Sequence, residues 1–177
     1  MKKIHLASKI IKNKNIILKP ISIDHYIHFY KHSSNKKIFK YMEYQSFNKK
    51  KTLEYLKNII YQSKSSQFQT WAIFFNLKFV GTITLRVKKN IKPYVEIAYA
   101  ISAPFWGKGI FLNSVKILIR YLKKRNIQSV YASVRADNFA SFIGLVKIGF
   151  RIENIFKTKS KKENKCYNTF LLKKKIT

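Results

Sequence analysis

The stretch that decides the fold is APFWGKGI, residues 103–110, in which Gly107 and Gly109 stand on either side of a lysine. The segment before it, YVEIAYAIS at 94–102, alternates in the way typical of a β-strand. After it, apolar residues recur at helical spacing. These residues are Phe111, Val115, Leu118 and Leu122. The two glycines therefore lie at a junction between a strand and a helix.

Such a junction can bind an anion, because the N–H groups of the first helical turn lack helical partners and lie at the positive end of the helix dipole. Three phosphate-binding loops are candidates. The chain has no G-x-x-x-x-G-K-[ST] of a P-loop, and it has Leu112 where a dinucleotide-binding loop needs a third glycine. The coenzyme A loop of acyltransferases needs only G-x-G/A between a central strand and its helix. A plain tight turn is the remaining alternative.

The rest of the chain divides into strands and helices of ordinary length. Seven strands are expected, at residues 15–21, 69–75, 79–87, 94–102, 130–134, 150–157 and 165–172. Helices are expected from an Asp24 cap to about Ser34, from an Asn48 cap to about Ser63, after Gly109, and from an Asp137 or Asn138 cap to Ile148 with Gly149 at its end, besides a short turn over 35–42. This order predicts one α/β domain over 1–177, with 1–13 as an N-terminal extension. Its mixed sheet has antiparallel early strands and a central crossover helix.

The sequence also bears on the cellular compartment in which the protein is expected. No apolar run reaches the roughly 18 residues of a membrane span, and the N-terminus lacks an apolar stretch of signal-peptide length. Cys166 is the only cysteine, so no internal disulfide can form. We therefore expect a cytoplasmic protein without membrane contact.

The net charge of +30 has two explanations. One is a polyanionic partner such as RNA or the ribosome. The other, which we favour, is drift in an A/T-rich genome, because only five of the 37 basic residues are arginine and Lys, Ile, Asn, Phe and Tyr are abundant. An RNA-binding protein ranks last, since no aromatic RNA-binding strand signature is present. Non-specific contact with nucleic acid in low salt is expected on either explanation.

Two segments, VEIAYAISAPFWGKGI at 95–110 and ADNFASFIGLVKIGF at 136–150, together resemble the GNAT superfamily of acetyl-CoA-dependent N-acetyltransferases. They look most like its RimJ/RimL-like branch, the ribosomal-protein-alanine and -serine N-acetyltransferases. The resemblance covers about residues 14–173 and is most specific in the second half. It implies the GNAT fold, with about four helices around a mixed, mostly antiparallel sheet of seven strands. That sheet is splayed in the middle, often at a bulge.

The resemblance also implies how acetyl-CoA is bound. The backbone from Trp106 to Ile110 would hold the pyrophosphate, and the strand exit from Tyr99 to Ser102 would meet the pantetheine arm and the acetyl group. Asn138 would bond the pantetheine amide, and Ser141 would lie near the sulfur. The implied coenzyme-binding residues are Tyr99, Ala100, Ile101, Ser102, Trp106, Gly107, Lys108, Gly109, Ile110, Asn138 and Ser141.

The chain departs from the family pattern in the loop and just after it. Pro104 stands where the superfamily often has Arg or Gln, and Phe111 and Leu112 stand where small residues are usual. The two larger side chains would crowd the coenzyme if they pointed toward it.

Glu96 and Ser141 are the expected catalytic residues. Family members often carry a catalytic Glu at the position of Glu96, where it would take a proton from the amine directly or through a water. The structural alternative is a glutamate paired with a lysine. Ser141 would assist the leaving thiolate, or would be only a first-turn hydroxyl. Tyr99 and Tyr131 are further possible proton donors, although strand tyrosines more often pack.

Other chemistry is less favoured. The spacing of His25, His28 and His32 matches no standard zinc site, so no metal is expected. Cys166 has no visible partner base and is not expected to be a nucleophile.

The function implied by the resemblance is transfer of acetyl from acetyl-CoA to a primary amine by direct attack. The preferred acceptor is the N-terminal amine of a ribosomal or other protein. The alternatives are a polyamine or small-molecule amine acetyltransferase and a non-catalytic acyl-CoA-binding regulatory module of the same fold. The sequence leaves monomer and dimer open, together with the identity of the acceptor.

Overall fold

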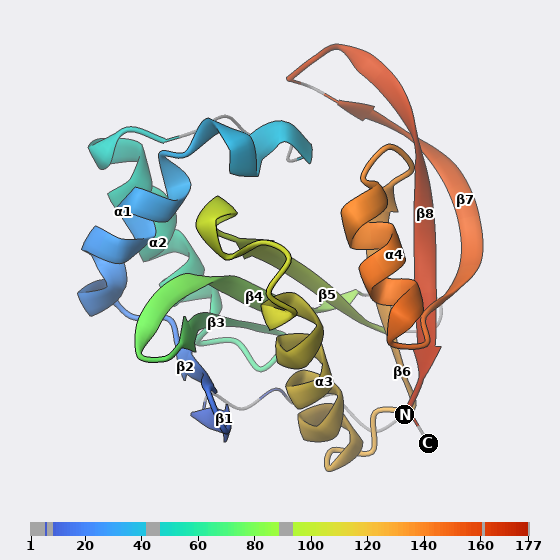
Figure 1. Cartoon of the computed structure of the whole chain (residues 1–177), viewed down its shortest axis with the longest axis horizontal. Helices are drawn as coiled ribbons and strands as arrows, with labels where there is room; N and C mark the ends of the chain where they lie inside the picture. Colours follow the sequence, from blue (N-terminus) through green and yellow to red (C-terminus); the bar gives the residue numbers. More distant parts are fainter. Residues whose placement is uncertain (1–5, 7–8, 42–46, 89–93, 161, 177) are drawn as a thin grey trace.

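The computed structural model describes residues 6, 9–41, 47–88, 94–160 and 162–176. Its strands form one sheet in the order β1-β2-β3-β4-β5-β6-β8-β7. They are β1 (Ile11–Asn13), β2 (Ile16–Pro20), β3 (Phe68–Phe75), β4 (Lys78–Lys88), β5 (Tyr94–Ile101), β6 (Ser129–Arg135), β7 (Arg151–Ser160) and β8 (Lys165–Lys175). The α-helices are α1 (Tyr26–Ser33), α2 (Lys49–Gln62), α3 (Ile110–Lys123) and α4 (Phe139–Lys147), and the 3-10 helices are η1 (Ile23–His25), η2 (Lys36–Tyr41) and η3 (Ala103–Phe105) (Figure 1).

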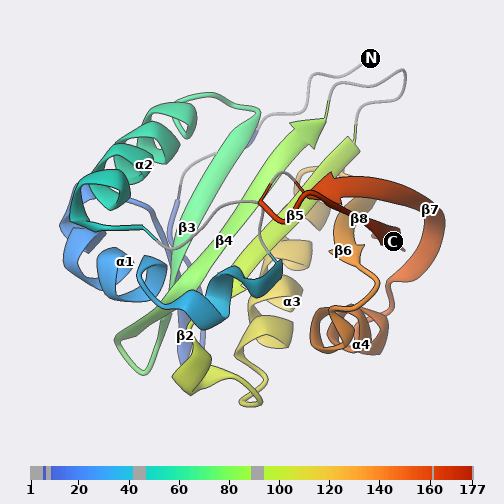
Figure 2. The ribbon, with the colours of Figure 1, turned by 90° about the horizontal axis from the view of Figure 1, so that it is seen from above.

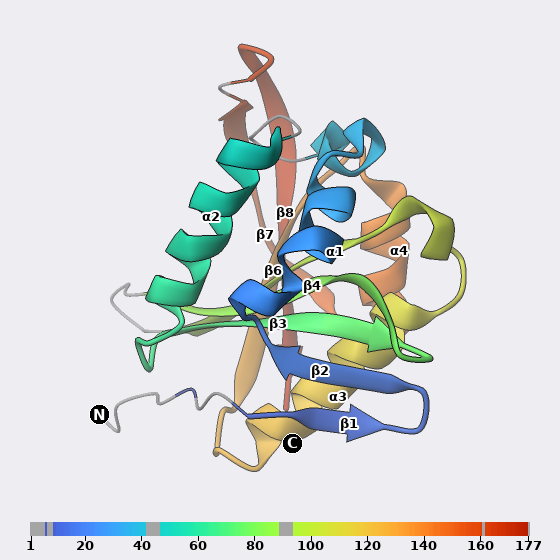
Figure 3. The same cartoon turned by 90° about the vertical axis from the view of Figure 1, so that its left-hand side faces the viewer.

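Helices cover both faces of the sheet, as Figures 2 and 3 show from two directions. On one face, α3 and α4 pack on the larger hydrophobic core, which includes Trp71 and Ile73 of β3. On the other face, α1 and α2 enclose a smaller core that contains Phe29, Leu56 and Ala72. Because successive strand residues point to opposite faces, β3 contributes to both cores.

The apolar stripe predicted after the glycines is the buried face of α3. Val115, Leu118 and Leu122 are fully buried, whereas Lys116 and Arg120 are exposed. Each buried aliphatic side chain of this kind contributes about 1.5–3 kcal/mol by removal of apolar surface from water. This anchoring holds the N-terminus of α3 beside the end of β5.

The sheet is splayed between β5 and β6, as the fold implies. These two strands are parallel and pair only at Val95 with Val130 and at Glu96 with Tyr131. On its other side, β5 pairs with β4 along its whole length, from Tyr94 to Ile101, without a shift of register. The splay therefore opens without a bulge in β5.

Two expectations about the first part of the chain need correction. The sheet has eight strands and not seven, because residues 11–13 of the expected N-terminal extension form β1 against β2. A strand of three residues has no readable periodicity and exists only through its pairing. The second correction concerns the first helical segment, which is capped by Ser22 and not by Asp24. The N–H of Ser22 donates to His25 Nδ1 at 3.1 Å, and this bond fixes the start of η1 one turn before α1.

The other helix ends follow the predictions. Asn48 caps α2 by accepting from the N–H of Lys51 at 2.9 Å, and Asn138 caps α4 by accepting from the N–H of Ser141 at 3.3 Å. Gly149 follows α4 with φ 88°. The turn expected over 35–42 is η2, and residue 42 lies outside the described residues.

Candidate active site

The glycine loop leads from the end of β5 into α3. Gly107 and Gly109 have φ of 74° and 68°, and Gly109 is the N-cap residue of α3. Both values lie in the left-handed region that favours glycine. A Cβ on Gly107 would meet no atom within 4 Å, so this part of the loop borders open space.

The N-terminus of α3 lies beside that open space. The first N–H to bond within the helix is that of Asn113, which donates to the carbonyl of Gly109 at 3.1 Å. The N–H groups of residues 110–112 precede it and have no carbonyl of a preceding turn to bond. The loop is held to the strand by Trp106, whose Nε1 donates to the carbonyl of Ile101 at 2.7 Å. A fixed row of donors at a positive helix end is what a diphosphate requires.

The opening between β5 and β6 begins next to Glu96. Beyond that residue, the edge of β5 that faces β6 pairs with no described strand over residues 97–101. Asn138 and Ser141 lie across the opening. Asn138 is the N-cap residue of α4, and Ser141 is in its first turn. The tertiary structure thus brings together the strand exit, the glycine loop and the start of α4, although α4 lies about 40 residues further along the chain.

Tyr99 projects from β5 toward α3 and α4. Its ring stacks on Phe111 with 3.9 Å between the ring centroids. Its hydroxyl is hidden from solvent and has no hydrogen bond of good geometry with the described residues. Burial raises the pKa of Tyr99 well above its usual range, and a polar contact from Ser141 offsets only part of that rise. Tyr99 therefore presents a neutral O–H donor without an acceptor, which fits a ligand rich in carbonyl oxygens such as the pantetheine arm of coenzyme A.

The side chain of Phe111 packs between β5 and α4. The ring of Phe111 lies against Tyr99 and against Gly144 of α4, where a Cβ would come within 2.7 Å of it. Gly144 therefore makes room for the larger side chain, and Phe111 becomes part of the join between α3 and α4.

Glu96 lies on the other face of β5 from Tyr99, because the two residues differ by an odd number of positions. Glu96 is 9% exposed, and its carboxylate accepts from Ser133 Oγ at 2.7 Å and lies 3.3 Å from Lys88 Nζ. This is the lysine pairing that the sequence left as an alternative to a catalytic role. The carboxylate nevertheless bridges β4, β5 and β6 at the point where the sheet parts.

A cavity of about 40 Å³ lies on the same face as Glu96, under α1 and α2. It reaches Ala100 at the strand exit, and a volume of this size exceeds the roughly 10–15 Å³ that one water needs. The residues that line it are Phe29, His32, Ser33, Ile38, Phe47, Tyr55, Ile59, Phe68, Thr70, Thr82, Thr84, Arg86 and Ala100. Tyr99 thus lies on one face of β5 and this cavity on the other.

His32 and Arg86 both line this cavity, and the sequence had not singled out Arg86. His32 Nδ1 and Ser102 Oγ are 2.7 Å apart, so α1 is joined to the exit of β5. Burial lowers the pKa of His32 to about 4, which keeps its ring neutral near pH 7. Arg86 follows the buried Leu85 in β4, and the two side chains point to opposite faces of the sheet. A charged residue inside an otherwise apolar strand is the sequence feature that could have identified Arg86.

His25 and His28 pack against phenylalanine rings. His28 stacks on Phe79 and His25 tilts against Phe74, at centroid distances of 6.1 and 5.5 Å. Within the described ranges, no three His, Cys, Asp or Glu side chains gather as a metal site would require.

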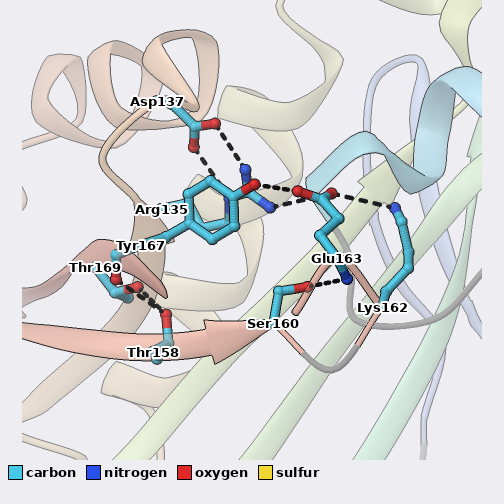
Figure 4. A network of polar contacts seen from close by, with 8 residues as sticks. All are labelled: Arg135, Asp137, Thr158, Ser160, Lys162, Glu163, Tyr167 and Thr169. Carbon is cyan, nitrogen blue, oxygen red and sulfur yellow. Dashed lines mark hydrogen bonds and ion pairs between the residues drawn. The ribbon is translucent and has the colours of Figure 1, made fainter. Parts of the chain in front are cut away.

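A polar network surrounds Arg135 at the end of β6 (Figure 4). Arg135, the last residue of β6, binds Asp137 through two nitrogens at 2.7 and 3.0 Å and lies 3.7 Å from Glu163. Its guanidinium carbon is 3.4 Å from the ring centroid of Tyr167 and 5.5 Å from that of Tyr41 in η2. Tyr167 also donates to Glu163. The network joins β6, the β7–β8 turn and η2, and it neutralises both carboxylates.

Comparison with known proteins gives matches that include β5, the glycine loop and α4. The sequence matches the family described as "Acetyltransferase (GNAT) domain" over residues 15–151. An acetyltransferase from Salmonella typhimurium, described as modifying the N-terminal serine of 50S ribosomal subunit protein L7/L12, is 18% identical with a TM-score of 0.84 over 96% of this chain and 100% of that chain.

Two other solved structures are similar to the same extent. Mycobacterium smegmatis RimJ, in complex with CoA-disulfide, is 16% identical with a TM-score of 0.79 over 90% of this chain and 81% of that chain. The microcin C7 self-immunity acetyltransferase MccE, in complex with acetyl-CoA and AMP, is 20% identical with a TM-score of 0.84 over 93% and 94%. At such identities, these structures establish the fold.

Proposed function

Because the chain belongs to the GNAT acetyltransferase family and uses acetyl-CoA as its co-substrate, we propose that it acetylates the N-terminal amine of a protein, with ribosomal proteins as preferred acceptors. The observation that carries the proposal is the opening between β5 and β6. It has the glycine loop and α4 on one face and a cavity on the other. A thioester held from one face can then meet an amine from the other.

The coenzyme side of the proposed site begins at the start of α3. The N–H groups after Gly109 hold the pyrophosphate, and Lys108 adds a positive charge. The unpaired edge of β5 and the side chain of Asn138 bond the pantetheine arm. The Asn138 oxygen already accepts from the N–H of Ser141, so its amide nitrogen is the group left to donate.

The acetyl transfer is a direct attack of nitrogen on the thioester carbon, in which a C–N bond forms and the C–S bond breaks. The amine must be neutral to attack, and a free α-amino group has a pKa of about 8. Glu96 takes the proton from this nitrogen, directly or through a water, and the Ser141 or Tyr99 hydroxyl supplies a proton to the departing sulfur. An N–H on the free edge of β5 stabilises the developing oxyanion.

The charges around the opening favour a neutral or acidic acceptor over a polyamine. Among the described residues here, Glu96 is paired with Lys88, and Asp137 and Glu163 are paired with Arg135. No unpaired carboxylate remains at the opening to attract a polycation. This supports a protein N-terminus over the alternative of a polyamine.

The test is a panel of acceptors with acetyl-CoA, followed by thiol release and by mass spectrometry of the products. Peptides with a free N-terminus should gain one acetyl group on the α-nitrogen, and the same peptides with a blocked N-terminus should not. Turnover of polyamines or small-molecule amines alone would reassign the acceptor. Coenzyme binding without turnover of any amine would indicate the non-catalytic acyl-CoA-binding module.

A further inference from the structure

Arg86 stands in the wall of the cavity under α1 and α2, and no ion pair links it to another described residue. Its Nε is hidden from solvent and has no hydrogen-bond partner among the described residues. Its guanidinium carbon lies 5.9 Å from the ring centroid of Phe68. Hiding part of a charged group from water without a hydrogen bond is unfavourable, so this site favours a ligand that can accept from it.

The natural partner of Arg86 within the sheet is already engaged. Glu96 stands directly opposite Arg86 in the β4–β5 register, yet its carboxylate binds Ser133 and Lys88. The side chain of Arg86 therefore remains available, on the same face of the sheet as Glu96.

Arg86 also joins two recesses. The cavity of about 40 Å³ contains Arg86 and Phe68 in its wall, and so does an open groove of about 760 Å³ near the end of α2. The groove is further lined by Lys64 and Lys88 and has no acidic residue in its lining. The two recesses adjoin at Arg86 and Phe68, so an acceptor path along them would pass Lys64 and Arg86 and lead toward Ala100 at the strand exit.

The length of this path suits the first residues of a peptide. Thr82 pairs with Ala100, and Arg86 lies four residues further along β4, or roughly 13 Å at 3.3 Å per residue. An extended peptide whose amine is placed near Ala100 would carry its next few side chains toward Arg86 and the groove.

We propose that Arg86 selects acceptors that carry an Asp or Glu side chain within the first five residues of their N-terminus. The carboxylate accepts from the guanidinium of Arg86, with Lys64 adding attraction at the groove. Charge-assisted hydrogen bonds of this kind are among the stronger ones in proteins. The inference rests on the proposed function, since it names the class of protein N-terminus that the site prefers.

The experiment compares matched peptides that carry Glu or Gln at one of positions 2 to 5. With the wild-type protein, kcat/KM should be about tenfold higher for the best Glu peptide than for its Gln counterpart, mainly through a lower KM, and the ratio should fall as salt rises. Arg86→Gln should bring the ratio close to one, whereas Arg86→Lys should retain part of it.

Arg120→Gln is the matched control, because it removes the same charge from the exposed face of α3. It should leave the ratio unchanged. Acetyl-CoA affinity and melting temperature, measured on all variants, separate loss of folding from loss of selection. Equal ratios in the wild type and in Arg86→Gln would overturn this inference alone. Turnover of other amines without turnover of any peptide would overturn the proposed function and this inference with it.

Discussion

At the scale of single residues, the site depends on positions where a side chain is absent or lacks a partner. Gly107 and Gly109 adopt left-handed backbone conformations next to a helix start, and Tyr99 carries a buried hydroxyl without a good acceptor. Glycine adopts this backbone conformation readily, whereas a buried hydroxyl without an acceptor is unfavourable. Both features are consistent with groups that coenzyme A would satisfy.

Gly107→Val tests the loop. The left-handed backbone should make the variant less stable by about 1–2 kcal/mol, and the side chain would occupy the open space beside the α3 N-terminus. Calorimetric titration should therefore show at least tenfold weaker binding of coenzyme A. Gly149→Ala is the control, because it introduces similar strain at φ 88° next to the flexible end of Lys174 and away from the loop. Equal losses of affinity in the two variants would refute a phosphate-binding role for the loop.

Tyr99→Phe tests the buried hydroxyl. Removal of a buried group without a partner should leave stability unchanged or raise it by about 1 kcal/mol. Turnover should fall about tenfold if this hydroxyl serves the thioester or the thiolate. Thermal melts and steady-state kinetics check both expectations. Tyr131→Phe is the matched variant, since its ring already packs against Tyr94 and below Lys173, and it should affect turnover little.

At the scale of elements, the proposed site depends on how far β5 and β6 stay paired. Pairing at Val95 and Glu96 holds the two halves of the sheet together, and the absence of pairing beyond them exposes the edge of β5. Glu96 lies where the pairing of β5 with β6 ends, and its carboxylate contacts both neighbouring strands. A role in catalysis and a role in holding this junction make different predictions.

Glu96→Gln separates these roles. The amide can still accept from Ser133, so folding and acetyl-CoA affinity should be close to wild type. If Glu96 is the base, kcat/KM near pH 7 should fall by roughly 10²–10³. The deficit should shrink toward pH 9, where an amine of pKa about 8 loses its proton unaided. A deficit that is constant across pH, or a melting temperature that falls with it, would favour the structural role.

At the scale of the whole molecule, the two helical layers meet the sheet in different ways. The buried residues of the larger core under α3 and α4 are mostly aliphatic, with Trp71, Tyr121 and Phe150 among them. The smaller core under α1 and α2 is rich in aromatic and histidine rings. His32 connects this second layer to the strand exit through Ser102. No helix among the described residues has the length and apolar character to cross a membrane.

The buried His32 should make stability depend on pH. Its pKa is about 4 in the folded protein and 6.5 when unperturbed, so only the unfolded chain takes up this proton between those values. Stability should therefore fall as the pH decreases from 6.5 to 4, by at most about 3 kcal/mol. Denaturant unfolding of the wild type and of His32→Gln checks this. The variant should retain only a smaller slope, from groups such as His25, whose pKa burial also lowers.

The sequence by itself determined the order of the seven predicted strands and the four α-helices. It also determined the glycine junction and the candidate site residues on β5 and α4. These are local signals, since side-chain periodicity, caps and left-handed glycines act over a few residues. Only the tertiary structure decided that β5 and β6 pair over two positions, that residues 11–13 add a strand, and that Glu96 binds Ser133 and Lys88. It also decided that Arg86 and His32 line one cavity. Each of these contacts joins groups that the chain brings together only by folding, and no local pattern specifies which of many distant partners a side chain meets.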